Sequence, residues 1–318
     1  MTELELWKYT RSIIENGNPL MMTIVMDARE STPGKQGFRM VAGLNGEING
    51  SVGGGKMEFD VIQESAESLK SGKKENYFKY YNHYGDAPGS TGMICSGSQI
   101  IGYVRLDSGS LETISKIINA IEKNTGGIFT ADKNGIGFSE LNGRTKKFEF
   151  DEEKWSYSEI IGIKERVYIF GGGHVGLALS RVMSFLDFHV IVVEKRKEIF
   201  TLINNSHANE IINEDFVDFS KKIIEDNFSY IVIVTPSHWH DEDVLRAVID
   251  KKVKYIGMMG SKAKVKSIFR NMKKDGITEE MLNNIHSPIG IQINSKTPDE
   301  IAISIAAEII KEKNSMFF

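Results

Sequence analysis

The part of the chain that most constrains its fold lies between residues 167 and 194. An apolar run there predicts a buried strand, which breaks at a turn with the spacing Gly171-x-Gly173-x-x-Gly176. A helical pattern follows, and a second apolar run ends in Glu194, 21 residues beyond Gly173. Strand, glycine turn, helix, strand and acid in this order form the dinucleotide-binding fingerprint in the context that it requires. The alternative is a glycine-rich loop between unrelated elements.

Each glycine of this turn has a mechanical role in such a fold. The first makes the tight turn, the second lets backbone N–H groups approach a pyrophosphate, and the third lets helix and strand pack closely. The helix N-terminus then offers an anion unpaired donors and a positive dipole end. His174 at the helix start either touches the bound anion or is solvated. The residues expected to bind a cofactor here are Gly171, Gly172, Gly173, His174, Gly176 and Glu194.

The order of the predicted elements indicates two domains of different kind. The second half alternates strand-like and helix-like segments, which predicts a parallel, doubly wound sheet. The first half combines helical patterns, short glycine-rich strands and asparagine–glycine turns, which predicts an α+β region. We therefore expect an α/β protein with an α+β domain over residues 1–160 and a Rossmann-like nucleotide- or cofactor-binding domain over residues 161–318. The boundary is expected in the polar segment 151–164.

Composition excludes several classes of protein. The 318 residues carry a net charge of −4 without a basic stripe, so nucleic acid is not an expected partner. No run of about 18 apolar residues predicts a membrane span, and no secretory signal is evident, so we expect a soluble, cytoplasmic protein. The single cysteine, Cys95, excludes an internal disulfide framework and a cysteine-rich metal site within one chain.

The loop Gly50–Lys56 nearly matches a phosphate loop. It is followed by Met57, where a serine or threonine should hold Mg²⁺, so ATP hydrolysis is disfavoured. We expect instead a nest of backbone N–H groups for an anionic ligand, with a lysine as a point charge. The alternative is a turn-rich hairpin with an exposed lysine. The residues assigned to this cofactor-binding loop are Gly53, Gly54, Gly55 and Lys56.

Cys95, His238 and His240 are the candidates for chemistry. Cys95 stands among glycines, where a thiolate could ligate a soft metal such as molybdenum or carry sulfur; the alternative is a buried small hydrophobe. The two histidines follow the predicted strand Tyr230–Val234, at the end where such sheets bind ligands. In an extended segment they would share a side and could act in proton transfer or metal binding. The alternative is helix capping near Ser237.

Basic residues leave two questions open. Glu194 favours a free ribose diol, whereas Lys195 and Arg196 could neutralise a 2′-phosphate, so the sequence does not decide between NAD and NADP. The stretch Gly260–Lys266 predicts either a second anion site or a solvated basic helix face.

The motifs taken together resemble the XdhC/CoxI family of xanthine dehydrogenase accessory proteins. The resemblance covers nearly the whole chain and keeps the motif order. It rests on Ser31–Gly34, Gly37–Met40, Gly50–Gly55 with Glu58, Gly92–Cys95, Gly171–Gly176, Ser237–His240 with Asp243, Tyr255–Lys262, His286–Ile291 and Thr297–Glu308.

The resemblance implies a maturation factor for molybdenum hydroxylases rather than the hydroxylase itself. Such factors bind the molybdenum cofactor (molybdopterin), promote its sulfuration with a cysteine desulfurase and deliver it to a xanthine dehydrogenase-type apo-enzyme. The alternatives are an NAD(P)-dependent oxidoreductase, with His238 or His240 as proton donor, and a non-catalytic dinucleotide-binding module. Short strands with edges that need cover also predict a homodimer.

Two positions depart from the family pattern. The glycine run is often followed by cysteine in the family, and Lys56 stands there in this chain. A second motif often reads Cys-Gly-Gly, and here it is Cys95-Ser96-Gly97. With one thiol in the chain, any persulfide would have to pass directly to or from a partner.

Overall fold

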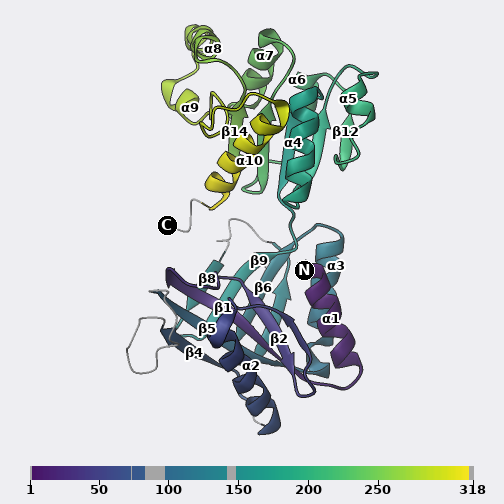
Figure 1. Ribbon diagram of the computed structural model, residues 1–318, viewed down its shortest axis with the longest axis vertical. Helices are drawn as coiled ribbons and strands as arrows, with labels where there is room; N and C mark the ends of the chain where they lie inside the picture. The colour runs from purple at the N-terminus through teal and green to yellow at the C-terminus, as the bar shows by residue number, and fades with distance from the viewer. Residues whose placement is uncertain (1, 73, 83–96, 142–147, 315–318) are drawn as a thin grey trace. The chain divides into compact units, whose positions relative to one another are not determined.

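The computed structural model describes residues 2–72, 74–82, 97–141 and 148–314. The chain divides into two compact units, Met1–Ile163 and Lys164–Phe318, and each is described by itself (Figure 1). No helix in the described ranges is both long enough and apolar enough to cross a membrane.

The N-terminal unit is an α+β structure with two antiparallel sheets. The five-stranded sheet has the order β3-β2-β1-β5-β4, and the four-stranded sheet has the order β7-β6-β9-β8. The strands of the larger sheet are β1 (Leu20–Glu30), β2 (Arg39–Gly43), β3 (Ile48–Gly50), β4 (Tyr77–Asn82) and β5 (Gly97–Leu106). Those of the smaller sheet are β6 (Gly127–Asp132), β7 (Gly135–Ser139), β8 (Phe148–Asp151) and β9 (Ser156–Ile161).

Helices cover both faces of the five-stranded sheet. Alternate residues of β1 enter two different cores, with Met22 and Ile24 in one and Met21 and Val25 in the other. The first core is shared with α1, α3 and the smaller sheet, and the second with α2. The strand is therefore apolar along most of its length because both of its faces are buried. The helices are α1 (Glu3–Glu15), α2 (Gly55–Lys70) and α3 (Leu111–Glu122), the last preceded by the 3₁₀ turn Ser108–Ser110.

A buried ion pair joins the two sheets of this unit. Arg39 on β2 donates from Nη2 to the carboxylate of Glu159 on β9, and both side chains are less than a tenth exposed. The guanidinium also lies over the rings of Trp7 and Phe129, at 5.7 and 5.2 Å from their centroids. Burial raises the pKa of Glu159 to about 7, although Arg39 acts in the opposite direction.

This raised pKa predicts that the N-terminal unit loses stability as the pH rises. Between the ordinary glutamate pKa of 4.5 and about 7, the folded state binds more protons at Glu159 than the unfolded state, so the free energy of unfolding falls with pH by up to about 3 kcal/mol. Glu159→Gln keeps a neutral hydrogen-bonding group and should remove this fall. Urea denaturation of both proteins from pH 5 to 8 measures it; parallel pH profiles would contradict the prediction.

The C-terminal unit is a Rossmann-like parallel sheet, as the sequence predicts. Its five strands have the order β12-β11-β10-β13-β14, and all neighbours are parallel. The strands are β10 (Arg166–Phe170), β11 (His189–Val193), β12 (Glu210–Ile212), β13 (Ser229–Ile233) and β14 (Tyr255–Met258). The helices are α4 (His174–Phe185), α5 (Phe200–Ile203), α6 (Phe216–Ser220), α7 (His238–Val248), α8 (Lys262–Lys274), α9 (Glu279–Asn283) and α10 (Pro298–Asn314).

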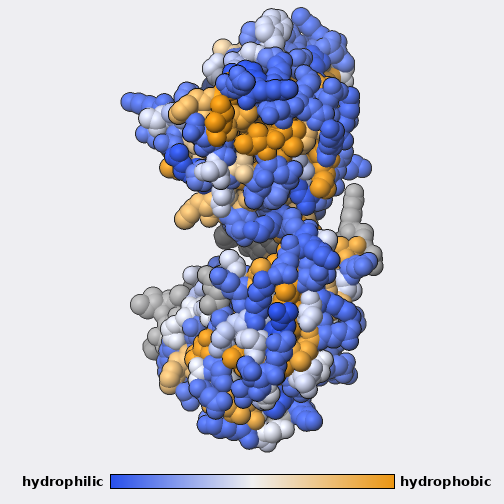
Figure 2. Space-filling view, turned by 90° about the vertical axis from the view of Figure 1, so that its right-hand side faces the viewer, coloured by the Kyte–Doolittle hydropathy of each residue, from blue (hydrophilic) through white to orange (hydrophobic). Residues whose placement is uncertain are grey.

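Helices lie on both faces of this sheet, which makes it doubly wound. Side chains of α4 and α10 pack on one face, and those of α6, α7 and α8 pack on the other. The chain leaves β10 toward β11 on one side, and β13 returns on the other side, so the strand order reverses beside β10. Ligands of such sheets bind at this reversal, outside the carboxyl ends of the strands. The surface of the unit is largely hydrophilic in the view of Figure 2, with a hydrophobic patch among the polar residues.

Candidate functional site

The candidate site is the edge of the parallel sheet where the strands end. Three adjacent strands, β10, β13 and β14, each lead there into a helix: α4, α7 and α8. Ser237 caps α7 by accepting from the His240 N–H at 3.3 Å, and Ser261 caps α8 by accepting from the Lys264 N–H at 3.3 Å. Gly173 begins α4 without a side-chain cap. Three positive helix ends therefore lie along one edge, which suits an anion.

The glycine turn is built as its spacing predicts. Gly171 has a φ of +119°, and a Cβ there would meet the carbonyl oxygen of Val234 well under 3.0 Å away. A Cβ at Gly176 would meet the carbonyl oxygen of Gly171 even more closely. A Cβ at Gly173 would meet nothing within 4 Å. The tight turn at Gly171 and the close packing at Gly176 are confirmed, and Gly173 faces open space, as approach of a ligand requires.

Glu194 follows β11, and its side chain lies against the glycine turn. Its buried carboxylate accepts from the Gly172 N–H at 3.0 Å and from the backbone and guanidinium of Arg196 at 2.7 to 3.1 Å. Burial opposes ionisation, but the hydrogen bonds from Arg196 and Gly172 prevail and lower the pKa of Glu194. A ribose diol at this carboxylate would compete with Arg196. The Glu194–Arg196 pair was not foreseen, because the sequence suggested opposing roles for the two residues.

The two histidines do not lie on an extended segment, so that expectation is wrong. His238 and His240 belong to the first turn of α7, where residues two apart point to different sides. His238 is exposed and lies against Trp239, with ring centroids 4.5 Å apart. His240 is half-buried; its Nε2 lies 2.8 Å from Nζ of Lys195, and its ring packs edge-on against Phe216. The Ser237 cap makes helix formation the stronger local preference.

A buried ion pair holds two helix starts of the edge together. Asp241, which is fully buried, accepts from the N–H and hydroxyl of Thr235 at 3.1 and 2.5 Å and from the ammonium of Lys264. Lys264 also donates to the carbonyl of Met259 at 3.2 Å. The pair therefore links the loop after β13 with the loop after β14. The sequence places Asp241 beside the histidines and Lys264 in the basic stretch Gly260–Lys266, but it does not indicate that the two side chains pair or that Thr235 joins them.

Removing Asp241 should destabilise this edge. Asp241→Ala leaves the Thr235 N–H and a partly buried ammonium without their acceptor, which should lower the free energy of unfolding by about 3 kcal/mol. The matched control is Asp243→Ala, an exposed acid on the same helix, with an expected change below about 0.5 kcal/mol. Adding Lys264→Met to Asp241→Ala should restore part of the loss. Urea denaturation measures all three, and equal effects of the two alanine variants would contradict the prediction.

The backbone N–H groups of the glycine loop in the N-terminal unit bind a side chain of the chain itself, the carboxylate of Glu58. Gly53, Gly54 and Gly55 all have positive φ. The carboxylate of Glu58 accepts from the Val52 and Gly54 N–H groups at 3.0 and 3.1 Å, and from the Ser51 hydroxyl. Burial opposes ionisation, yet these donors lower the pKa of Glu58. Lys56 is exposed.

The loop is braced by the segment that follows β1. The side-chain amide of Gln99 donates to the carbonyl of Gly34 at 3.1 Å, and the Thr32 hydroxyl donates to the same oxygen at 2.8 Å. A Cβ at Gly34 would meet the carbonyl oxygen of Val52 well under 3.0 Å away, so the two loops touch. Cys95 lies outside the described residues. In the described ranges, no group of three or more histidine, cysteine, aspartate or glutamate side chains is arranged to hold a metal.

Comparison with protein families gives two matches along the chain. Residues 13–81 match the XdhC and CoxI family, and residues 167–309 match the XdhC Rossmann domain. Together they cover about two thirds of the chain. The second match contains every element of the sheet edge described above, from the glycine turn to the ion pair.

Two curated proteins are similar to this chain. The chain is 24% identical over 305 residues to the uncharacterized protein YqeB of Escherichia coli (strain K12), covering 95% of this chain and 45% of that protein. It is 25% identical over 169 residues to a probable xanthine dehydrogenase subunit of Bacillus subtilis (strain 168), covering 52% of this chain and 48% of that protein. The chain thus spans about half the length of the curated relatives it matches.

A solved structure shares the fold. A crystal structure described as a xanthine dehydrogenase from Bacillus halodurans has a TM-score of 0.71 and 22% sequence identity to this chain. The similarity covers 99% of this chain and 96% of that one. It confirms the α+β unit followed by a Rossmann-like unit.

Proposed function

This chain belongs to the XdhC and CoxI family, and we propose that it is an accessory factor for a xanthine dehydrogenase-type molybdenum hydroxylase. In this proposal it binds the molybdenum cofactor, supports its sulfuration together with a cysteine desulfurase, and delivers it to the apo-enzyme. The relative of Bacillus subtilis named as a probable xanthine dehydrogenase subunit supports the choice of client.

The observation that supports the proposal is the open edge of the Rossmann-like unit, where three helices begin. Gly173 starts α4 with free space at its Cβ position, and the N-termini of α7 and α8 lie along the same edge. These groups fit the phosphate-bearing end of the cofactor. When bound, the cofactor would supply the pterin and the molybdenum centre, while the chain would supply backbone donors and the nearby charge of Lys195.

The proposal is tested by co-elution. The purified protein is mixed with isolated molybdenum cofactor and passed over a sizing column, and molybdenum is measured in the protein peak. We expect molybdenum to co-elute with the protein. Its absence, under conditions in which a known binder retains it, would end the proposal. Titration with NADH separates the alternatives: micromolar binding with turnover of a carbonyl substrate favours an oxidoreductase, and tight binding without turnover favours a dinucleotide-binding module.

Cys95→Ser tests the only thiol of the chain. We expect this variant to lose cofactor retention or support of sulfuration, because a hydroxyl neither ligates soft metals well nor carries sulfur. Circular dichroism controls for folding. Cofactor retention and support of sulfuration at the wild-type level would show that Cys95 takes no part in the mechanism. Loss of the fold would indicate that Cys95 is a buried hydrophobic residue.

A further inference from the structure

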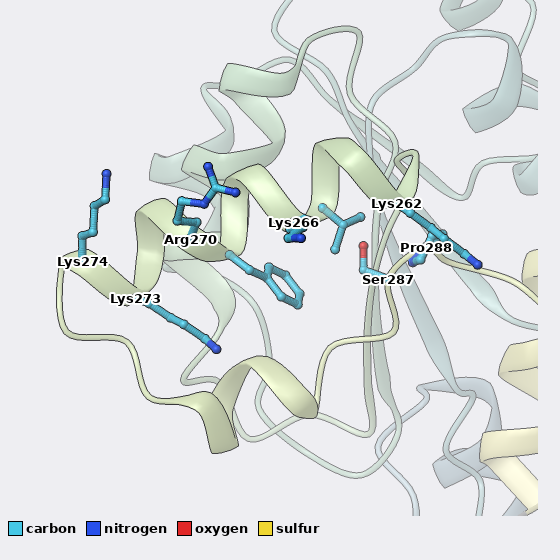
Figure 3. Close-up of a pocket in the computed structure, with 9 residues that line it drawn as sticks. Lys262, Lys266, Arg270, Lys273, Lys274, Ser287 and Pro288 are labelled. Atoms are coloured by element: carbon cyan, nitrogen blue, oxygen red, sulfur yellow. The ribbon is translucent and has the colours of Figure 1, made fainter.

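Helix α8 carries a basic groove that the proposed function does not use. A cavity of about 850 Å³ lies along this helix and against Ser287 and Pro288 (Figure 3). Val265 and Phe269 supply apolar surface within it. Its cationic lining residues are Lys262, Lys266, Arg270, Lys273 and Lys274.

The cations follow the length of the helix rather than meeting at a point. Lys262, Lys266, Arg270 and Lys274 are each four residues apart, so the row spans roughly 18 Å at the rise of an α-helix. Figure 3 shows these side chains spread from one end of α8 to the other, with Pro288 near the Lys262 end. The groove is therefore elongated, positively charged and apolar on its inner side.

Most of these cations are not neutralised by the chain's own acids. Among the residues that the structure describes, Lys262, Lys266, Arg270 and Lys274 have no ion-pair partner, and Lys273 pairs with Glu279 at 3.1 Å. Asp275, the acid next to this row, is bound to Arg246 at 2.7 Å. Such a local concentration of positive charge on a chain of net charge −4 favours an acidic partner.

We propose that the α8 groove docks an acidic, amphipathic segment of a partner protein. Carboxylates of the segment would pair with the row from Lys266 to Lys274, and its apolar side chains would contact Val265 and Phe269. A small phosphate would need donors that converge on one point, whereas this row extends over several turns. A nucleic-acid backbone would leave the apolar surface without a partner, and a membrane would need a flat face rather than a groove.

A designed peptide tests the groove directly. The probe is a fluorescein-labelled helical peptide with glutamate at every fourth position and leucine along the neighbouring stripe; the matched peptide has glutamine in place of glutamate. We expect the full chain to bind the glutamate peptide at least about tenfold more tightly, with an affinity that falls as salt is raised. Fluorescence anisotropy measures both. Equal affinity for the two peptides, or no binding of either, would overturn the proposal.

Charge reversal locates the binding on α8. Lys266→Glu with Arg270→Glu should weaken binding of the glutamate peptide at least about tenfold. The same variant should bind a peptide with lysine in place of glutamate more tightly than the glutamate peptide. The matched control, Lys197→Glu with Lys123→Glu, makes the same charge change at exposed lysines elsewhere and should retain binding. If the charge reversal at Lys266 and Arg270 reduces folding, the neutral variant Lys266→Gln with Arg270→Gln is measured instead. An equal loss in the control, or tighter binding of tripolyphosphate or duplex DNA at the same residues, would overturn the assignment.

Discussion

Gly176→Val is expected to lower the free energy of unfolding of the C-terminal unit by about 4 kcal/mol or more, an exceptional loss for a single substitution. A Cβ at Gly176 would lie well under 3.0 Å from the carbonyl oxygen of Gly171. That oxygen belongs to the backbone, so no flexible side chain can move aside. Helix α4 would have to shift away from β10 and open the core that holds Leu179 and Ile169.

Denaturation in urea, followed by circular dichroism of the full chain, measures this loss. If Gly176→Val yields no folded protein, Gly176→Ala replaces it, because alanine adds the Cβ alone; we expect a loss of about 2 kcal/mol or more for this variant. Gly173→Ala is the matched control, since its Cβ would meet nothing within 4 Å. Gly176→Ala with a wild-type midpoint would contradict the packing argument.

The parallel sheet could be predicted from sequence because its signals are local. After their first residues, the strands β10 and β11 are continuous apolar runs, as expected where both faces of a strand are covered, and glycines mark where β10 ends. The steric demands at Gly171 and Gly176 follow from their spacing alone. Similarly, Ser261 before a run of helix-forming residues marks the start of α8, which the structure places at Lys262.

Two strands of the N-terminal unit, β4 and β9, have no clear strand pattern in the sequence. The alternation of β9 is hidden because one of its buried positions is Glu159, whose partner Arg39 is 120 residues away in the sequence. β4 lies at the edge of its sheet and is mostly half-buried or exposed, so Tyr77–Asn82 lacks an apolar run. Both strands depend on contacts that only the folded chain brings together.

The candidate site likewise combines features that the sequence predicts with features that it does not. The sequence located the glycine turn and Glu194, because a fixed spacing defines them. It did not show that Asp241 would pair with Lys264, 23 residues later, or that Glu58 would occupy the nest beside Gly54. Several acids and bases lie near each other in the sequence at these places, and the packing of the folded chain determines which of them form pairs.

Gly173→Val is expected to leave the fold nearly intact and to abolish cofactor binding. Gly173 has a φ of −73°, which any residue can adopt, and its Cβ position is open. The loss of stability should therefore stay within about 1 kcal/mol, which is the usual effect of a less favourable N-cap residue. A valine side chain would fill the space that a phosphate needs to reach the backbone N–H groups at the start of α4. We expect at least a hundredfold loss of affinity, or about 2.7 kcal/mol.

The comparison with Gly176 makes this prediction specific, because the two glycines are three residues apart and receive the same side chain. Gly176→Val should unfold at a much lower urea concentration than the wild-type chain, whereas Gly173→Val should unfold at nearly the wild-type midpoint and fail to retain molybdenum on the sizing column. Normal retention by Gly173→Val would show that this edge does not hold the cofactor. The loop Gly53–Lys56 and Cys95 would then be the remaining candidates, while the family matches over residues 13–81 and 167–309 would be unaffected.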